Sequence, residues 1–292
     1  MTIILKRKPT KHLQSTYVSG PMTGLPEMNT PEFFRQEARW AAAGWRVLNP
    51  ARFNPDFERI QNGNLIKPGT EESRAFCIWH DLEAVRETDA ITIMGGWEKS
   101  IGARDEIFLA RSLRHPILEA ETGREVSIDK HVCDRNVVYR DSTILVPTAT
   151  LRSAYISGPM TGLLEQNYPE FFAYEKRWSE AGWRILNPAR FNPVIEIHKK
   201  DHRIKPGSEE GRAASIWQDL EAIRETDVIL MLPGWEHSIG ARAELYTARA
   251  LRHPVIEAAT GREIIMDAHL CNYDIYVVTK QIATDYFALA AA

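Results

Sequence analysis

Hydrophobic and polar positions form alternating blocks along the chain, and these blocks predict strands and helices in turn. Short apolar runs at residues 17–19, 45–48 and 90–94 have the length of buried strands. The segments between them begin with helix-start signals: Asn29-Thr-Pro-Glu32, Thr70-Glu-Glu and Ser100. We expect these helices to end near Gly44, Thr88 and Arg114. A further strand begins at Pro116, and Thr122-Gly123 predicts a hairpin turn after it.

This alternation predicts an α/β fold with a mostly parallel sheet and flanking helices. Ligands of such sheets bind beyond the carboxyl ends of the strands. In this chain the loops at residues 19–24 and 95–100 follow two of the predicted strands. We therefore expect a ligand site where these two loops meet.

The same sequence motifs occur twice along the chain. YVSGPMTGL at Tyr17 returns as YISGPMTGL at Tyr155, and every such pair is offset by 138 residues. Over residues 17–126 and 155–264, 70 of 110 positions are identical. A period of this length is a whole domain, so the chain is a tandem duplication of one module. We expect modules at 1–138 and 155–292, with 139–154 as a linker or edge strand and 56–65 as a variable surface loop.

An acidic residue lies on the apolar face of the helix that follows Ser100. Ala103, Ile107 and Ala110 form an apolar stripe, and at 100° per residue Glu106 falls inside it. Asp105 is expected to point outward. The second repeat places Glu244 in the same way. Because a buried carboxylate is costly unless partnered, Glu106 and Glu244 are candidate catalytic acids. The alternative is a structural glutamate that pairs with backbone amides or an arginine.

A second acid lies on the preceding helix of each repeat. Asp81 is at the edge of the stripe formed by Ile78, Leu82 and Val85, and Asp219 repeats this position. A carboxylate there is able to project into a cleft, so both are candidate catalytic residues. The alternative is a salt bridge at the rim of the core.

The two loops offer groups that bind anions. Glycines in Ser19-Gly-Pro-Met-Thr-Gly24 let backbone amides approach a ligand. Ser100 begins a helix, whose N-terminus favours phosphate, although a simple helix cap explains the serine equally well. Trp97 and Trp235 are candidates for stacking on a base. The spacing of Asp129-x-His131-x-Cys133 is not typical of a zinc site, so we expect no metal.

The net charge, the apolar runs and the cysteine count limit the classes of protein to which the chain can belong. The 292 residues carry a net charge of −3, which argues against a partner that is a nucleic acid polymer. No apolar run approaches the length of a membrane span, and the N-terminus lacks the apolar core of a secretory signal. Three cysteines cannot all pair with one another. These features indicate a reduced, cytoplasmic protein without a membrane partner.

With these motifs assembled, each repeat resembles the nucleoside 2-deoxyribosyltransferase-like superfamily, and within it an uncharacterised group found in bacteria and phages. The resemblance rests on YISGPMTG at 155–162, Asn167, the segment Gly182–Ala189 that ends in NPA, Asp219-Leu220 and LPGWE-x-S-x-GA-x-x-E at 232–244. It covers about 110 residues of each repeat and implies a flavodoxin-like fold. Arg104 and Arg242 depart from the smaller residues of better-known members, and we expect them either to bind phosphate or to block the site.

The resemblance also implies residue roles. Glu106 and Glu244 match the nucleophile or its equivalent, and Asp81 and Asp219 match an acid that contacts or protonates the base. The matching substrate-binding residues are Tyr17, Ser19, Gly20, Met22, Trp97, Ser100 and Gly102, with Tyr155, Ser157, Gly158, Met160, Trp235, Ser238 and Gly240 in the second repeat.

The implied activity is hydrolysis of the N-glycosidic bond of (deoxy)nucleoside 5′-monophosphates or related nucleotides. The alternatives are base exchange by a nucleoside 2-deoxyribosyltransferase and a non-catalytic module that binds or sequesters nucleotides; a structural protein ranks last. The implied partner is a small nucleotide or nucleoside, with no cofactor. Because relatives build sites across subunit contacts, we expect an internal pseudo-dimer of the two repeats and allow for a further homo-oligomer.

Overall fold

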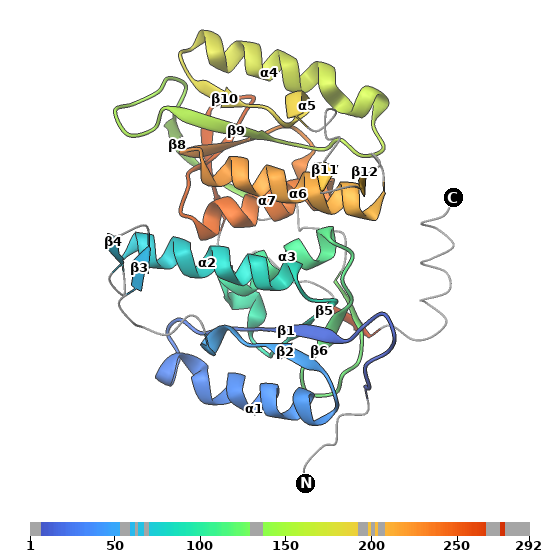
Figure 1. Ribbon diagram of the computed structural model, residues 1–292. Helices are drawn as coiled ribbons and strands as arrows, with labels where there is room; N and C mark the ends of the chain where they lie inside the picture. Colours follow the sequence, from blue (N-terminus) through green and yellow to red (C-terminus); the bar gives the residue numbers. More distant parts are fainter. Residues whose placement is uncertain are drawn as a thin grey trace. The chain divides into compact units, whose positions relative to one another are not determined.

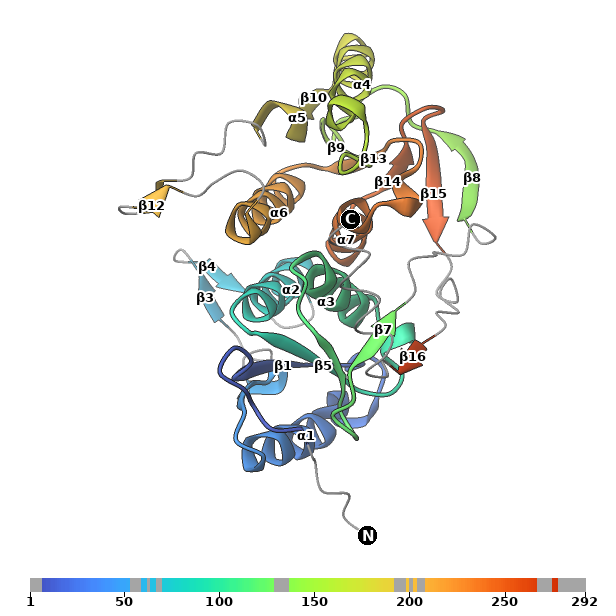
Figure 2. The same cartoon turned by 90° about the vertical axis from the view of Figure 1, so that its right-hand side faces the viewer.

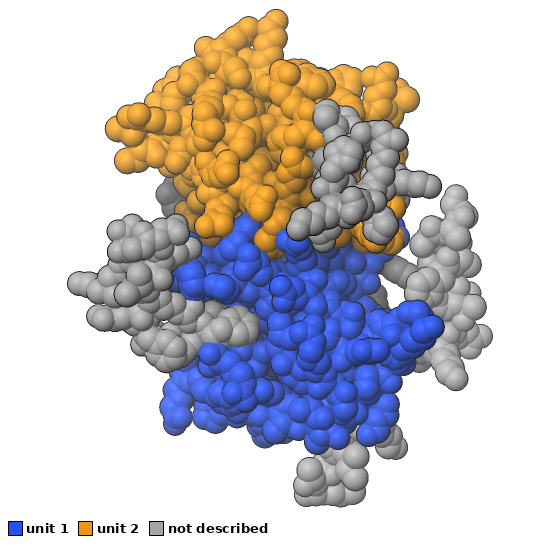
Figure 3. Space-filling view, in the orientation of Figure 1, with its two compact units in different colours: residues 1–130, 272–292 blue, residues 131–271 orange. Residues whose placement is uncertain are grey.

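A computed structural model of the chain describes residues 7–52, 59–61, 64–66, 70–128, 137–191, 198–199, 202–203, 208–266 and 275–277 (Figure 1). These residues form two compact units. Unit 1 contains residues 1–130 and 272–292, and unit 2 contains residues 131–271 (Figure 3).

The sheet of unit 1 has four parallel strands in the order β2-β1-β5-β6. They are β1 (Ser15–Ser19), β2 (Arg46–Leu48), β5 (Ala90–Ile93) and β6 (Ile117–Glu119). The main helices are α1 (Thr30–Ala42), α2 (Glu71–Arg86) and α3 (Ile101–Ser112). Shorter elements are η1 (Pro26–Asn29), η2 (Pro50–Arg52), η3 (Trp97–Lys99) and the strands β3 (Arg59–Gln61), β4 (Asn64–Ile66), β7 (Val126–Ile128) and β16 (Ile275–Val277).

Unit 2 repeats this arrangement in a larger sheet, ordered β10-β9-β13-β14-β15-β8. Its strands are β8 (Val137–Thr143), β9 (Ser153–Ser157), β10 (Arg184–Leu186), β13 (Val228–Met231), β14 (Val255–Glu257) and β15 (Arg262–Met266). The helices are α4 (Tyr168–Glu180), α5 (Pro188–Phe191), α6 (Glu209–Arg224) and α7 (Ile239–Ala250). The remaining elements are η5 (Leu164–Asn167), η7 (Trp235–His237), β11 (His198–Lys199) and β12 (His202–Arg203).

The expected fold class is confirmed. In each unit the first strand of the repeat lies between the second and the third, which is the flavodoxin-like order. The chain therefore changes direction across the sheet beside β1 in unit 1 and beside β9 in unit 2. The carboxyl ends of β1 and β5 meet at this switch point, where the sequence predicts the ligand site.

The two units divide the chain differently from the expected modules at 1–138 and 155–292. Residues 137–143 form the edge strand β8 of unit 2, although they follow the first repeat. The end of the chain contributes β16 to unit 1. The difference arises because strand pairing, and not sequence order, decides which unit a terminal segment joins.

Most helix starts follow their sequence signals. The Thr70 side chain accepts a hydrogen bond from the backbone N–H of Ser73, and Ser100 accepts one from Ala103, as helix caps do. Asn29 is an exception to the expected capping box. It adopts a left-handed backbone conformation (φ 57°), and its side-chain amide donates to the carbonyl of Pro21 instead. The loop after β1 is thereby tied to the start of α1.

The segment at 56–65, expected to be a loop, lies partly outside the described residues. Its described part contains β3 and most of β4, which pair as an antiparallel hairpin. Among the described residues, every helix is too short or too polar to cross a lipid bilayer.

Candidate active site

Glu106 is held by two hydroxyl groups from β1. Tyr17 and Ser19 lie two residues apart on this strand, so their side chains share the face that α3 covers. The Tyr17 hydroxyl donates to Glu106 Oε1 over 3.0 Å, and the Ser19 hydroxyl donates to Oε2 over 2.5 Å. Glu106 itself is 7% exposed. The acid that the helical pattern singled out is therefore a buried, hydrogen-bonded group near the end of β1.

The second repeat builds the same arrangement independently. Ser157 donates to Glu244 Oε2 over 2.5 Å, and Tyr155 donates to Oε1 over 3.4 Å. Glu244 is half-buried, so it is somewhat more accessible than Glu106. Both acids thus have hydroxyl partners, and neither of the structural alternatives, backbone amides or an arginine, accounts for these hydrogen bonds.

Tyr17 also brings Asp81 into the group. Burial raises the pKa of Tyr17 well above its ordinary value, the negative charges of Asp81 and Glu106 raise it further, and so does hydrogen bonding to both acids. Burial and the charges of Asp219 and Glu244 do the same for Tyr155. Tyr17 therefore keeps its proton and lies between two carboxyl groups, one from α2 and one from α3.

The buried position changes the acidity of both glutamates. Loss of solvation raises the pKa of Glu106 to about 7, although the hydrogen bonds from Ser19 and Tyr17 oppose this. The same causes raise the pKa of Glu244 to about 7, with Ser157 and Tyr155 opposing. A carboxyl group with this pKa exchanges its proton near neutral pH, as general acids and bases do.

The N-terminus of α3 lies beside the carboxyl end of the sheet. Ser100 caps this helix, and Ser238 caps α7 by accepting from the N–H of Ala241. A Cβ atom at Gly102 would meet nothing within 4 Å, and one at Gly240 would meet only the Ser238 hydroxyl, at 3.9 Å. The first turn of each helix therefore has open space beside it. The structure gives both serines the capping role and leaves phosphate contact as a prediction.

Three of the predicted binding positions have packing roles in the structure. A Cβ at Gly20 would lie 2.5 Å from Met94 Cε, so this glycine allows the loop to pack against β5. Met22 packs against the core beneath α1. Trp97 is 2% exposed and therefore offers no open ring face for a base. Their counterparts Gly158, Met160 and Trp235 behave in the same way.

Two neighbours of Glu106 differ from expectation. Asp105, expected to point outward, is 1% exposed, because burial extends around nearly the whole of α3. Arg104 is also buried, and its Nε donates to the carbonyl of Glu98 over 2.5 Å. Arg242 makes the related bond to the carbonyl of Ser238. In the structure both arginines hold the turn that precedes the helix. The helical pattern does not reveal this, since it identifies only one buried face.

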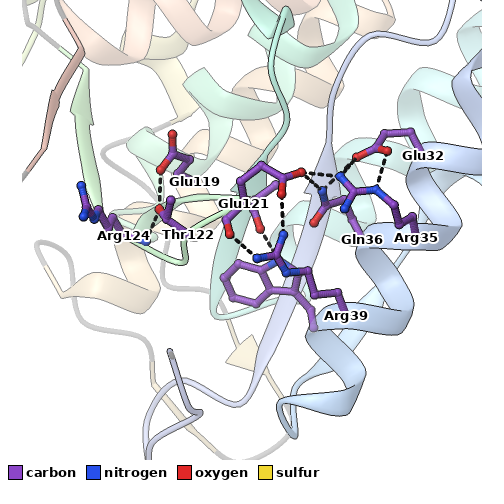
Figure 4. A network of polar contacts seen from close by, with 10 residues as sticks. Glu32, Arg35, Gln36, Arg39, Glu119, Glu121, Thr122 and Arg124 are labelled. Atoms are coloured by element: carbon purple, nitrogen blue, oxygen red, sulfur yellow. Dashed lines mark hydrogen bonds and ion pairs between the residues drawn. The ribbon is translucent and has the colours of Figure 1, made fainter. Parts of the chain in front are cut away.

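A cavity of about 410 Å³ lies between the N-terminal end of α1 and the carboxyl ends of β5 and β6. Its lining includes Asn29, Glu32, Met94, Glu119 and Glu121, and neither Glu106 nor Asp81 borders it. The Glu121 carboxylate accepts hydrogen bonds from side chains of α1 (Figure 4). The cavity therefore contains acids that form ion pairs or hydrogen bonds, and no pattern in the sequence marks them in advance.

This charged network is specific to the first repeat. Arg35 and Arg39 form ion pairs with Glu121, and Gln36 donates to it over 2.5 Å (Figure 4). The second repeat has Ala259 in place of Glu121, and Ala173 and Tyr174 replace Arg35 and Gln36. By contrast, the Tyr, Ser, Asp and Glu of the candidate active site are present in both repeats.

Asp129, His131 and Cys133 lie outside the described residues. Within the described part of the chain, no cluster of three or more His, Cys, Asp or Glu side chains has the arrangement of a metal site.

Comparison with known proteins places both repeats in one family. Residues 14–119 and residues 152–257 each match the family described as a domain of unknown function, DUF4406. The chain belongs to the DUF4406 family. Each matched DUF4406 segment contains its own complete set of Tyr, Ser, Asp and Glu, and both segments end before β7 and β15.

Other comparisons add little to this assignment. No curated protein matches the chain. Among solved structures, a crystal structure of the ABC domain in complex with L-Trp from Streptococcus pneumonia is 10% identical and covers 84% of this chain and 74% of that chain. Its TM-score of 0.24 is too low to support an argument about fold or function.

Proposed function

We propose that this protein hydrolyses the N-glycosidic bond of (deoxy)nucleoside 5′-monophosphates or related nucleotides. The observation that carries the proposal is the glutamate of each repeat, buried in unit 1 and half-buried in unit 2, held by a Tyr and a Ser and with a pKa raised to about 7. The resemblance of both repeats to the nucleoside 2-deoxyribosyltransferase-like superfamily assigns the nucleophile to these same two glutamates.

The chemistry requires two functions at the C1′–N bond. As this bond breaks, positive charge develops at C1′, and the ionised carboxylate of Glu106 stabilises that charge or attacks C1′. The bonding electrons leave with the base, which takes a proton from an acid, and Asp81 is the candidate. Water then adds to C1′, displaces Glu106 where that residue has attacked, and gives its proton to the ionised Asp81, which leaves the sugar phosphate as product. Tyr17 and Ser19 hold the carboxylate oxygens in position throughout.

The position of the group supports a nucleotide substrate. Ser19 ends β1 at the switch point of the sheet, and open space beside Gly102 adjoins the first turn of α3. The free N–H groups of a helix N-terminus favour a phosphate. A nucleoside monophosphate is therefore able to place its phosphate at α3 and its C1′ towards Glu106.

The test is release of free base. The purified protein is incubated with ribo- and deoxynucleoside monophosphates and the corresponding nucleosides, and the products are separated by chromatography. We expect free base from monophosphates, at least 100-fold less of it from the double variant Glu106→Gln, Glu244→Gln, and normal release from a matched control. The control is Glu72→Gln, Glu210→Gln, which changes one exposed acid on α2 and its counterpart on α6.

Other outcomes separate the competing functions. New nucleoside formed only when an acceptor base is added would identify a base-exchange transferase, because the base and not water then reaches C1′. Tight binding of a nucleotide without any turnover would replace the enzyme with a binding module. Equal base release from the double Glu→Gln variant would overturn the assignment of the two glutamates.

A further inference from the structure

Each of the two repeats is followed along the chain by a strand that lies outside the repeat. β8 begins at residue 137, and β16 begins at residue 275, which is its counterpart at the 138-residue offset. In the same way, β7 at 126–128 is the counterpart of residues 264–266 in β15. Each repeat thus ends in a strand, β7 or β15, and is followed by one further strand.

Each of these following strands pairs in the unit built mainly from the other repeat. β8 follows the first repeat and pairs with β15 in unit 2, and β16 follows the second repeat and pairs with β7 in unit 1 (Figure 2). Both pairings are antiparallel. If each repeat kept its own strand, β7 would pair with β8, and β15 with β16.

The register of the two pairings is the same. Val126 lies opposite Val277 in unit 1, and their counterparts Ile264 and Tyr139 lie opposite one another in unit 2. Likewise Ile128 pairs with Ile275, as Met266 pairs with Val137. Because a register shift of one residue exchanges the two faces of a strand, agreement at every shared position indicates one specific docking mode used twice.

We propose that β7 and β15 are docking edges for the strand that follows the other repeat, so that the two repeats are joined by reciprocal strand exchange. An edge strand presents unpaired N–H and C=O groups, and an added strand satisfies them. Exchange of an identical element is a simple route by which two copies of one module assemble. The partner of each edge is therefore a second copy of the repeat, supplied here within one chain.

Engineered disulfides test the pairing in the full chain. Cys77, Cys133 and Cys271 are first replaced by serine, and a protease site is inserted after Ala149, within the exposed segment 148–150 between β8 and β9. Two variants carry cysteines at exchanged partners: V126C with V277C, and Y139C with I264C. Two matched variants carry them at the partners expected without exchange: V126C with Y139C, and I264C with V277C. Directly opposed residues of an antiparallel pair are close enough for a disulfide.

Cleavage after oxidation makes the result readable on a denaturing gel. The exchanged pairs join residues on opposite sides of the cleavage site, so we expect both variants to keep a full-length band that reduction splits into two fragments. The matched variants should give two fragments without reduction. Full-length bands from none of the four variants, or from all four, would overturn the proposal, as would fragments held together only between different chains. None of these outcomes depends on whether the protein cleaves nucleotides.

Discussion

Burial of the Glu106 carboxyl group makes folding sensitive to pH. Its pKa rises from the ordinary 4.5 to about 7 because the buried site solvates the charge poorly. Below pH 4.5 the group is protonated in both the folded and the unfolded chain. Between pH 4.5 and 7 the unfolded chain is ionised while the folded chain is not, so stability falls as the pH rises and reaches its lower level above pH 7.

Glu106→Gln should remove the contribution of Glu106 to this dependence, because the amide has nearly the same shape and no charge. We expect the variant to exceed the original protein in free energy of unfolding at pH 8, by up to about 3 kcal/mol, with a much smaller difference at pH 4.5. Urea unfolding at the two pH values measures this, with Glu72→Gln as the control. An equal difference at both pH values would contradict the assigned pKa.

The Ser19 hydroxyl lowers the pKa of the same carboxyl group, whereas burial raises it. It donates to Oε2 over 2.5 Å and so favours the ionised form, which lowers the pKa of Glu106. Ser19→Ala should therefore raise this pKa further above 7. Carbon-13 NMR of labelled glutamate carboxyl groups, with Glu106→Gln to assign the signal, follows the titration directly. Thr16→Val is the control, since Thr16 contacts Thr92 on the other face of the sheet, and a similar upward shift there would refute the local cause.

At the scale of elements, Asp89 fixes the start of β1. One carboxylate oxygen, Oδ2, accepts from the backbone N–H groups of Gln14 and Ser15 over 2.9 and 2.8 Å, and from the Ser15 hydroxyl over 2.7 Å. Asp227 repeats this arrangement in unit 2. Burial alone raises the pKa of Asp89, but these hydrogen bonds outweigh it and lower the pKa below its ordinary value.

Asp89→Ala should destabilise the protein by about 2 kcal/mol at pH 7, because hydrogen bonds to a charged group are lost and two backbone donors lose their partner. The lowered pKa means that this stabilisation is present above the ordinary pKa and disappears as the pH falls through the folded value. Thermal unfolding at pH 7 and pH 3 measures both effects. A loss of stability that is as large at pH 3 as at pH 7 would rule out the charged form as its source.

The local sequence predicts the positions of the helices and strands, but it does not predict what packs around them. Caps at Thr70 and Ser100 and the apolar stripe of α3 predict the helices within a few residues. They also predict that Glu106 faces the core. The stripe wrongly places Asp105 outside, because the pattern of one helix cannot show what covers its remaining surface. Similarly, the Tyr17 and Ser19 partners depend on strand register, which single-sequence patterns do not supply.

At the scale of the whole molecule, the duplication predicts two similar units but not how the terminal strands are shared. The sequences around β7 and β15 are so alike that either edge suits either following strand, and chain order alone favours the nearer one. The structure pairs each strand with the farther edge. Strand exchange is thus a property of the assembled chain, and it has a consequence for how the units unfold.

Unfolding of unit 2 should weaken unit 1. When unit 2 is folded, most of the chain between β7 and β16 is already ordered, so pairing of these two strands costs little additional entropy. When it unfolds, pairing of these strands must close a disordered loop of nearly 150 residues, at an entropic cost of about 4 kcal/mol. A strand of three residues cannot offset this cost, so β16 should leave β7 whenever unit 2 opens.

Hydrogen exchange followed by mass spectrometry tests this coupling. Asp227→Ala lies in unit 2 and should increase opening of that unit, and we expect it to accelerate exchange of the β7 amides at 126–128 as well. The control is Glu210→Gln, an exposed change in unit 2 that should leave β7 unchanged. If Asp227→Ala accelerates exchange in unit 2 while β7 exchanges at its original rate, the two units open independently.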